Sequence, residues 1–333
     1  NTPTIYSAFG AFKDPVCATT ALRICSLSVA NKKEIQKTML SFLIWFIFIS
    51  MHPLFKNKYV LLFVALLAVS SSAWVVRFLP NLSSTTIAFW RMFLASVMAF
   101  IISYKTFFTF VPNKKILVAG LFLGAHFALF FRSVQLTSIA EAALLGTISP
   151  VFTEIYSILF QRKHFSSKVS LGLLLALFGA LILISQSSFS ATSSLGNIFA
   201  VLCSVAMAAV LLIGKEVRKS VGLFEYSRWI FFYASVCLFF IALVQGVSVL
   251  EFQSANFAWF LFLAAVPTMV GHNIFYYLVK SLSATTVAAT PLGEPVISSI
   301  GAFFLFGEPV GLHVFFGGVI TLVGVFYVIK YGD

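Results

Sequence analysis

Charged residues are scarce in this chain. Only 10% of its 333 residues are Asp, Glu, Lys or Arg, whereas a soluble domain averages about 25%. This shortage excludes a water-soluble globular protein. Acidic residues are the scarcer kind, with 10 against 22 Lys and Arg and a net charge of +12. Because the basic residues stand between apolar segments, they indicate membrane orientation and no nucleic-acid partner.

Cysteine is also rare, and the motifs of common enzymes are missing. The four cysteines form no C-x-x-C pair and no Cys/His cluster with metal-ligand spacing. There is no H-E-x-x-H, no G-x-S-x-G and no P-loop. We therefore expect no metal, no cofactor and no catalytic residue, and we exclude a primary pump. An intramembrane enzyme and a channel stay as weaker alternatives, since no filter-like segment or ring of charges is visible.

Long apolar runs are what the chain has instead. Hydrophobic residues make up 60% of it, 40 residues are Phe, and the mean hydropathy is +1.01. A membrane helix needs about 20 mainly apolar residues, and ten segments meet this need. They span residues 59–78, 85–104, 116–135, 140–160, 168–186, 195–214, 225–246, 257–279, 284–305 and 311–330. The expected fold class is an all-α polytopic membrane protein with ten transmembrane helices in a lipid bilayer.

Lys and Arg are unevenly divided between the loops. If the flank before the first segment is cytoplasmic, only Arg77 and Arg132 fall outside. The residues that fall inside are Lys56, Lys58, Lys105, Lys114, Lys115, Arg162, Lys163, Lys168, Lys215, Arg218, Lys219, Lys280 and Lys330. This bias predicts that both ends of the ten-helix unit face the cytoplasm, in the cytoplasmic (inner) membrane.

Residues 1–57 form an N-terminal extension with one apolar run, at 39–50. This run is short for a span, and it fits a signal-like stretch, an interfacial helix or an eleventh span. The simplest expectation is that translation begins at Met39 or Met51 and that the rest is upstream reading frame.

The second half of the chain repeats the first. At an offset of 145 residues the alignment pairs Pro150 with Pro295, Gly172 with Gly317, and Gly179 with Gly324. Residues 58–186 and 194–330 are therefore two five-helix repeats. Because five is odd and short loops reverse the chain at each helix, the second repeat must enter the membrane in the opposite orientation. Inverted repeats are the architecture of secondary transporters, with the site near the midplane between them.

Two stretches of each repeat carry a recognisable pattern. The first repeat reads SIAEAALLGTISPVF and then GLLLALFGALILI, and the second reads ATTVAATPLGEPVIS and then LFGEPVGLHVFFGGVITLVGVFYVI. This doubled pattern resembles the EamA-type modules of the drug/metabolite transporter superfamily. The resemblance covers about residues 59–330 and implies a ten-helix carrier of metabolites such as amino acids, nucleotide derivatives or toxic compounds. The first repeat departs from the family's Gly-Glu-Arg-like turn, since it reads FQRKHF where the second repeat has FGEPV.

Polar residues inside the spans are the candidates for a site, because an ionisable group there costs about 2.5–3.5 kcal/mol to insert. The candidates for substrate binding or coupling are Glu294, Glu154, His272, His126, Arg91, Arg228, Tyr276, Asn273 and Trp74. Glu294 leads them, because it lies near the centre of the segment 284–305. It can contact a substrate amino group, carry a coupling proton, or pair with Arg91 or Arg228. His272 leaves H⁺ coupling open as well.

Pro150 and Pro295 fall in the middle of spans, where each removes a helical hydrogen bond and frees a carbonyl one turn earlier. A membrane tolerates such a break against protein or a wet cavity. We therefore expect both segments to line a central cavity and to bend there, although a kink that only improves packing is the alternative. The paired glycines at 172 and 179 and at 317 and 324 predict close helix packing.

Together these features predict a secondary carrier that works by alternating access, as a monomer or a homodimer. Carboxylates, Arg and His in one cavity suit a small zwitterionic metabolite, such as an amino acid, a sulfonium or a nucleoside-like compound. The alternative is an efflux carrier for toxic compounds. Coupling to H⁺ and exchange without an ion are equally compatible with the residues.

Overall fold

The computed structural model describes residues 57–103, 113–162, 164, 166–184, 191–307 and 311–332. Over these residues the chain forms helices and no strand. The apolar run at 39–50 lies outside the described residues, together with Met39 and Met51.

The first repeat has four continuous helices and one divided segment. The helices are α3 (Lys58–Phe78), α4 (Ser84–Ile102), α5 (Lys114–Leu136) and α8 (Ser167–Ile184). The divided segment consists of α6 (Ile139–Gly146) and α7 (Ser149–Leu159). Side chains of Asn57, Ser83, Asn113 and Ser138 accept hydrogen bonds from amides of the first turns. These N-caps explain why the helices begin where they do.

The second repeat is more irregular. It begins with α9 (Ala191–Val217) and α10 (Leu223–Val244) and ends with α15 (Leu312–Tyr331). Its third segment contains the 3₁₀ turn η4 (Ser254–Asn256), α11 (Phe257–Leu263), the π-helix η5 (Ala264–His272) and α12 (Asn273–Leu278). Its fourth segment contains α13 (Ala284–Ala289), the 3₁₀ turn η6 (Thr290–Gly293) and α14 (Glu294–Phe306). Both fourth segments are thus interrupted near a proline.

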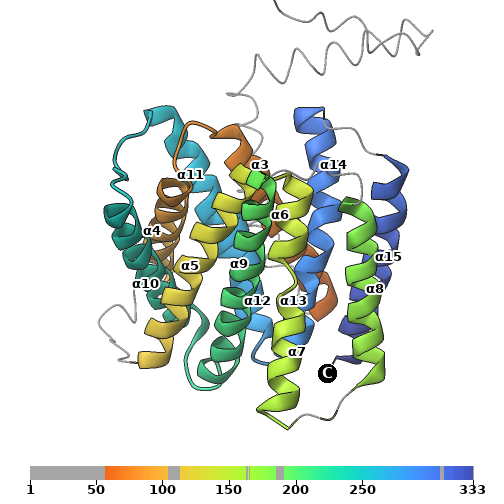
Figure 1. Ribbon diagram of the computed structural model, residues 1–333. Helices are drawn as coiled ribbons and strands as arrows, with labels where there is room; N and C mark the ends of the chain where they lie inside the picture. The colour runs from red at the N-terminus through yellow and green to blue at the C-terminus, as the bar shows by residue number, and fades with distance from the viewer. Residues whose placement is uncertain are drawn as a thin grey trace, which may run out of the picture.

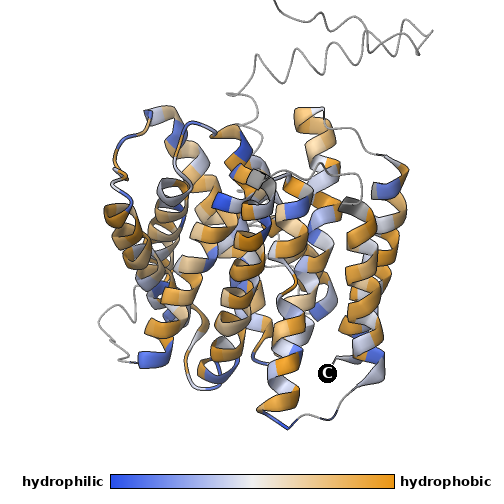
Figure 2. Cartoon of the chain, viewed as in Figure 1, coloured by the Kyte–Doolittle hydropathy of each residue, from blue (hydrophilic) through white to orange (hydrophobic). Residues whose placement is uncertain are grey.

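The helices have the length and composition of membrane spans. In the part of the chain that the structure describes, eight helical segments are long and apolar enough to cross a bilayer. Shorter apolar stretches occur in α8 and α15. Large apolar side chains such as Phe63, Phe178 and Phe304 are exposed on the outside of the bundle, and Figure 2 shows an apolar band along the helices. The chain is therefore an integral membrane protein.

Contacts between the repeats join equivalent elements (Figure 1). The second helices, α4 and α10, pack together, and so do the fifth helices, α8 and α15. The first helix of each repeat packs on the third segment of the other, because α3 contacts η5 and α9 contacts α5. This reciprocal pattern is what a two-fold relation between the two repeats produces.

Glycines allow α8 and α15 to touch backbone to backbone. A Cβ on Gly179 would lie 2.6 Å from the Gly317 carbonyl oxygen, and a Cβ on Gly324 would lie 2.6 Å from the Gly172 carbonyl oxygen. Gly172, early in α8, lies against Gly324, late in α15, whereas the later Gly179 lies against the earlier Gly317. The two helices are therefore antiparallel. The predicted close packing at these four glycines is therefore present, with Gly172 against Gly324 and Gly179 against Gly317.

Replacing Gly179 with Ala should lower the melting temperature of the purified protein. The added Cβ would lie 2.5 Å from the Thr321 amide nitrogen, and overpacking of this kind costs about 1–3 kcal/mol. Gly222→Ala is the matched control, because its Cβ would lie 3.7 Å from the nearest atom. Equal melting temperatures for the two variants in the same detergent would contradict the packing described above.

Candidate functional site

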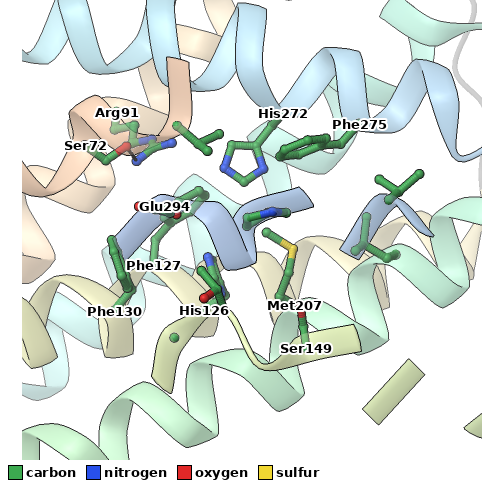
Figure 3. Close-up of a pocket in the computed structure, with 16 residues that line it drawn as sticks. Ser72, Arg91, His126, Phe127, Phe130, Ser149, Met207, His272, Phe275 and Glu294 are labelled. Carbon is green, nitrogen blue, oxygen red and sulfur yellow. Dashed lines mark hydrogen bonds between the residues drawn. The ribbon is translucent and has the colours of Figure 1, made fainter. Parts of the chain in front are cut away.

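A small cavity lies between the repeats, where both interrupted segments meet (Figure 3). Its polar lining consists of Ser72, Arg91, His126, Thr147, Ser149, His272 and Glu294. Its volume is about 40 Å³, which is small beside the roughly 300–1,000 Å³ of a typical ligand pocket. The polar side chains of this group therefore lie close together.

The π-helix η5 positions Arg91 of α4. Within η5, the Thr268 hydroxyl donates to the Leu263 carbonyl five residues earlier at 2.8 Å, and it accepts a hydrogen bond from Arg91 Nε at 2.7 Å. Arg91 Nη1 donates to Ser72 Oγ of α3 at 3.0 Å. The guanidinium carbon lies 4.1 Å from the centre of the Phe127 ring, a cation–π distance. Three segments thus hold this side chain in place.

One nitrogen of the Arg91 guanidinium forms no hydrogen bond with the described residues. The side chain is buried, and the nitrogen is Nη2. A guanidinium has five N–H donors, and a carboxylate is the partner that matches its fork. Because an orphaned buried donor is costly, this nitrogen is a natural contact for an anionic group of a ligand.

Glu294 brings the opposite charge to the same cavity. It is the first residue of α14, directly after η6, where the positive end of the helix dipole favours a carboxylate. Figure 3 shows it near Arg91, which is the cation that acts on it electrostatically. Within the described ranges its carboxylate has no hydrogen bond or ion pair. The cavity therefore holds a cation and an anion that, among the described residues, form no ion pair with each other.

Two histidines complete the polar lining. His126 Nδ1 lies 2.9 Å from the Cys203 carbonyl oxygen. Because a carbonyl only accepts, Nδ1 carries the hydrogen and Nε2 is left as an acceptor. His272 is the last residue of η5, and its Nδ1 is buried without a hydrogen-bond partner in the part that the structure describes. The side chains of His272 and His126 reach the cavity from opposite repeats.

The interruption at Pro150 is stabilised by α9. Pro150 has no amide hydrogen, so the Gly146 carbonyl four residues earlier loses its helical donor. Cys203 Sγ lies 3.8 Å from that carbonyl oxygen, and Ser204 Oγ donates to the neighbouring Leu145 carbonyl at 2.8 Å. In the second repeat, Pro295 lies in the first turn of α14. Both interruptions therefore border the cavity, which is the setting that a membrane requires for such breaks.

The structure brings together four of the predicted site residues, namely Arg91, His126, His272 and Glu294. It places Glu154 at the contact of α7 with α13, where the carboxylate accepts a hydrogen bond from Thr285 Oγ1 at 2.8 Å. It places Arg228 on α10, where Nη2 lies 4.0 Å from Glu225 Oε1. Neither residue lines the cavity.

The other three predicted residues take part in helix packing. Tyr276 lies behind His272, with the ring centres 6.2 Å apart. Asn273 accepts a hydrogen bond from Ser227 Oγ at 2.6 Å. Trp74 donates through Nε1 to the Ser298 carbonyl at 2.9 Å. These polar groups join the two repeats or two helices of one repeat, outside the cavity lining.

Several lining residues were missed in the sequence. Ser72 belongs to a Ser/Ala-rich stretch typical of helix packing, and Phe127 cannot be told apart from 39 other Phe residues by composition. The remaining missed residues are Val69, Phe130, Gly146, Thr147, Ser149, Met207, Leu211, Phe275, Val287 and Pro291. A position within four residues of Pro150 or of a predicted site residue is the signal that pointed to Phe130, Gly146, Thr147, Ser149, Phe275 and Pro291, and the other four lack it. Among the described residues, no three His, Cys, Asp or Glu side chains gather as a metal site.

Comparison with known proteins identifies the family. The model of the EamA-like transporter family matches residues 56–185 and 194–330. An "Uncharacterized transporter" of Archaeoglobus fulgidus is 27% identical over 214 residues, which are 64% of this chain and 76% of that protein. "Uncharacterized transporter YyaM" of Bacillus subtilis is 23% identical over 255 residues, which are 73% and 83% of the two chains.

A solved structure described as "Crystal structure of protein" has the same fold. It matches with a TM-score of 0.68 at 14% identity, over 82% of this chain and 97% of its own. The resemblance inferred from the two proline-containing stretches is confirmed by the family match. With both of its repeats matched, the chain belongs to the EamA-like transporter family.

Proposed function

We propose that this transporter is a secondary carrier that moves a small zwitterionic metabolite by alternating access. The observation that supports it is the presence of Arg91 and Glu294 in the lining of one small cavity. A substrate carboxylate would accept hydrogen bonds from Arg91, and a substrate amino group would donate to Glu294. The Nε2 acceptor of His126 suits a second donor on the same substrate.

Contacts between the repeats support two closures around this cavity. On one side Trp74 of α3 donates to the Ser298 carbonyl of α14. On the other side Thr285 of α13 donates to Glu154 of α7. A cavity of about 40 Å³ is too small for an amino acid, so one closure must open before a substrate can enter. Equivalent closures in the two repeats are what alternating access requires.

The membrane arrangement that we propose is ten helices in two inverted repeats. The helices α8 and α15 have 18 and 20 residues, which is about 27–30 Å at 1.5 Å per residue and matches the hydrocarbon core. The Lys115–Glu216 ion pair joins the start of α5 to the end of α9. That pair lies at the lysine-rich face of the bundle, and we propose that this face is cytoplasmic. The membrane that we propose is the inner (cytoplasmic) membrane.

A second candidate is efflux of a toxic apolar cation. The aromatic and thioether side chains of Phe127, Phe130, Phe275 and Met207 favour it, because they can accommodate a bulky apolar body beside Glu294. Such a substrate has no carboxylate, so this candidate requires Glu294 but does not use Arg91. We propose neither catalysis nor channel conduction for the cavity.

The proposal is tested by a thermal-shift screen followed by uptake in vesicles. Amino acids, sulfonium compounds and nucleosides are added to the purified protein, and any that raise its melting temperature are tested for uptake. We expect saturable uptake that is accelerated when the vesicles are preloaded with unlabelled substrate. Uptake with and without a pH gradient separates H⁺ coupling from exchange. Non-saturable uptake without counterflow would show a channel and contradict the proposal.

Replacing both Pro150 and Pro295 with Ala should slow uptake by about tenfold, which is the effect of about 1.4 kcal/mol on a barrier. Restored helical hydrogen bonds would stiffen the two segments that border the cavity, while the lining side chains stay. Initial uptake rates and thermal-shift affinities are compared with those of Pro80→Ala, because Pro80 is exposed in a turn. Full transport by the double variant would show that the prolines serve packing alone.

A further inference from the structure

A second and larger hollow lies on the opposite face of α5. Its floor is formed by Ala125, Ala128, Leu129 and Arg132, which are spaced i, i+3, i+4 and i+7 and so share one helix face. The cavity residues His126, Phe127 and Phe130 lie on the other face. The hollow, which we call the α5 groove, is therefore separated from the substrate cavity by the body of α5.

The α5 groove has an apolar part and a polar end. Its volume is about 630 Å³, and Phe199 of α9 and Ile241 of α10 form apolar walls. Its polar residues are Ser83, Ser84, Thr85, Arg132, Gln135 and Gln245. These residues stand at the start of α4 and at the ends of α5 and α10, where lipid headgroups meet a membrane protein. The groove therefore has the polarity of an amphiphile.

Arg132 is the cation of this groove. Thr85 Oγ1 donates to Gln245 Oε1 at 2.7 Å, and Gln135 Nε2 donates to the Leu82 carbonyl at 2.9 Å. Arg132 is exposed and, within the described ranges, has no hydrogen bond, ion pair or ring contact. Among the residues that the structure describes, no acidic one lines the groove. An anionic group is thus the partner that this end of the groove lacks.

We propose that the α5 groove binds an acidic phospholipid of the surrounding bilayer, with the phosphate at Arg132 and one acyl chain along Ala128, Phe199 and Ile241. An acyl chain that enters the groove leaves one hydrocarbon environment for another, so tail contacts add little selectivity. The headgroup contact with Arg132 supplies the preference, because a cation near the surface attracts acidic lipids. A bound lipid would pack against the groove face of α5, opposite the face that carries His126 and Phe127.

Lipid titrations of the purified full chain test this site. Dioleoylphosphatidylglycerol and dioleoylphosphatidylcholine are added separately in a neutral detergent, and melting temperature and bound lipid by native mass spectrometry are recorded. We expect the acidic lipid to raise the melting temperature by several degrees more than the zwitterionic lipid. Equal shifts for the two lipids would overturn the proposal, as would the same shift with inorganic phosphate alone.

Five variants locate the effect. Arg132→Gln should remove the extra stabilisation by the acidic lipid, and Arg132→Lys, which keeps the charge, should retain at least half of it. Ala128→Trp should block lipid retention by filling the floor, whereas Leu121→Trp, on an exposed position of α5 outside the groove, should not. Lys219→Gln controls for the loss of a distant exposed cation. Full acidic-lipid stabilisation of Arg132→Gln, or equal lipid loss in the two tryptophan variants, would place the lipid elsewhere.

Discussion

Replacing Glu294 with Gln is expected to abolish saturable uptake while the protein stays folded. Gln has nearly the same shape, so the first turn of α14 keeps its packing, but the anion of the cavity is lost. The substrate amino group would lose its charged acceptor. Removing one partner of a buried, hydrogen-bonded charge pair of this kind costs about 2–5 kcal/mol, which is about 30-fold or more in affinity. Substrate affinity by thermal shift and the initial uptake rate both measure this loss. If Glu294 also carries a coupling proton, stimulation by a pH gradient disappears with it.

The control for this experiment is Glu216→Gln. Glu216 is exposed and pairs with exposed Lys115 at the end of the bundle. Glu216→Gln therefore removes the same charge as Glu294→Gln, but at a site outside the cavity. Its uptake should equal that of the unaltered protein, since exposed ion pairs contribute little. Binding, uptake and pH dependence that all survive in Glu294→Gln would contradict the assignment of the central site.

Arg91→Gln is expected to reduce both the folded yield and transport. The buried carboxylate of Glu294 would lose the cation that compensates it, and the hydroxyls of Ser72 and Thr268 would lose their donor. Breaking a buried charge pair on one side costs about 3–5 kcal/mol. Melting temperature and the monodisperse fraction in size-exclusion chromatography measure the stability effect separately from transport.

Two further variants keep the role of Arg91 testable if Arg91→Gln does not fold. Arg91→Lys keeps the charge but not the fork that contacts Ser72 and Thr268 together, so we expect a folded protein with weakened binding. The double variant Arg91→Gln/Glu294→Gln removes both charges and should be more stable than Arg91→Gln alone. Equal stability of the single and double variants would mean that the two charges are not coupled. Normal uptake by Arg91→Lys of a substrate without a carboxylate would favour the cation-efflux candidate.

Helix positions could be predicted because a bilayer imposes a length of about 20 apolar residues on every span. The expected segment at 85–104 corresponds to α4, Ser84–Ile102. The predicted segment at 257–279 lies where the structure has α11, η5 and α12. Hydropathy could not predict the π-helix inside it. The local helix type around Pro267 depends on the groups that pack against it, and hydropathy does not contain them. That π-helix places Thr268 against Arg91, so this contact of the site could not be predicted from the sequence.

The rotation of each helix was harder to predict than its position. A helix that is apolar all round has no unique buried face, so the lining of a cavity cannot be separated from helix packing. Glu294 could be chosen because a carboxylate at mid-span is costly in every rotation. Trp74 and Tyr276 carry no such penalty, and the structure places them in contacts between helices. Arg228 was chosen for the same cost of insertion, yet its guanidinium lies near Glu225 instead of the cavity.

The antiparallel contact of α8 with α15, at one edge of the bundle in Figure 1, has a practical consequence for measuring motion. No side chain separates the two backbones at Gly179 and Gly324, so the helices cannot slide or rotate without collision. Spin labels on their exposed positions Leu174 and Val323 should report the same distance in every state of the transport cycle. The labelled pair is therefore a fixed reference. Changes in the distances from it to labels on α7 and α14 measure how far each of the two closures moves.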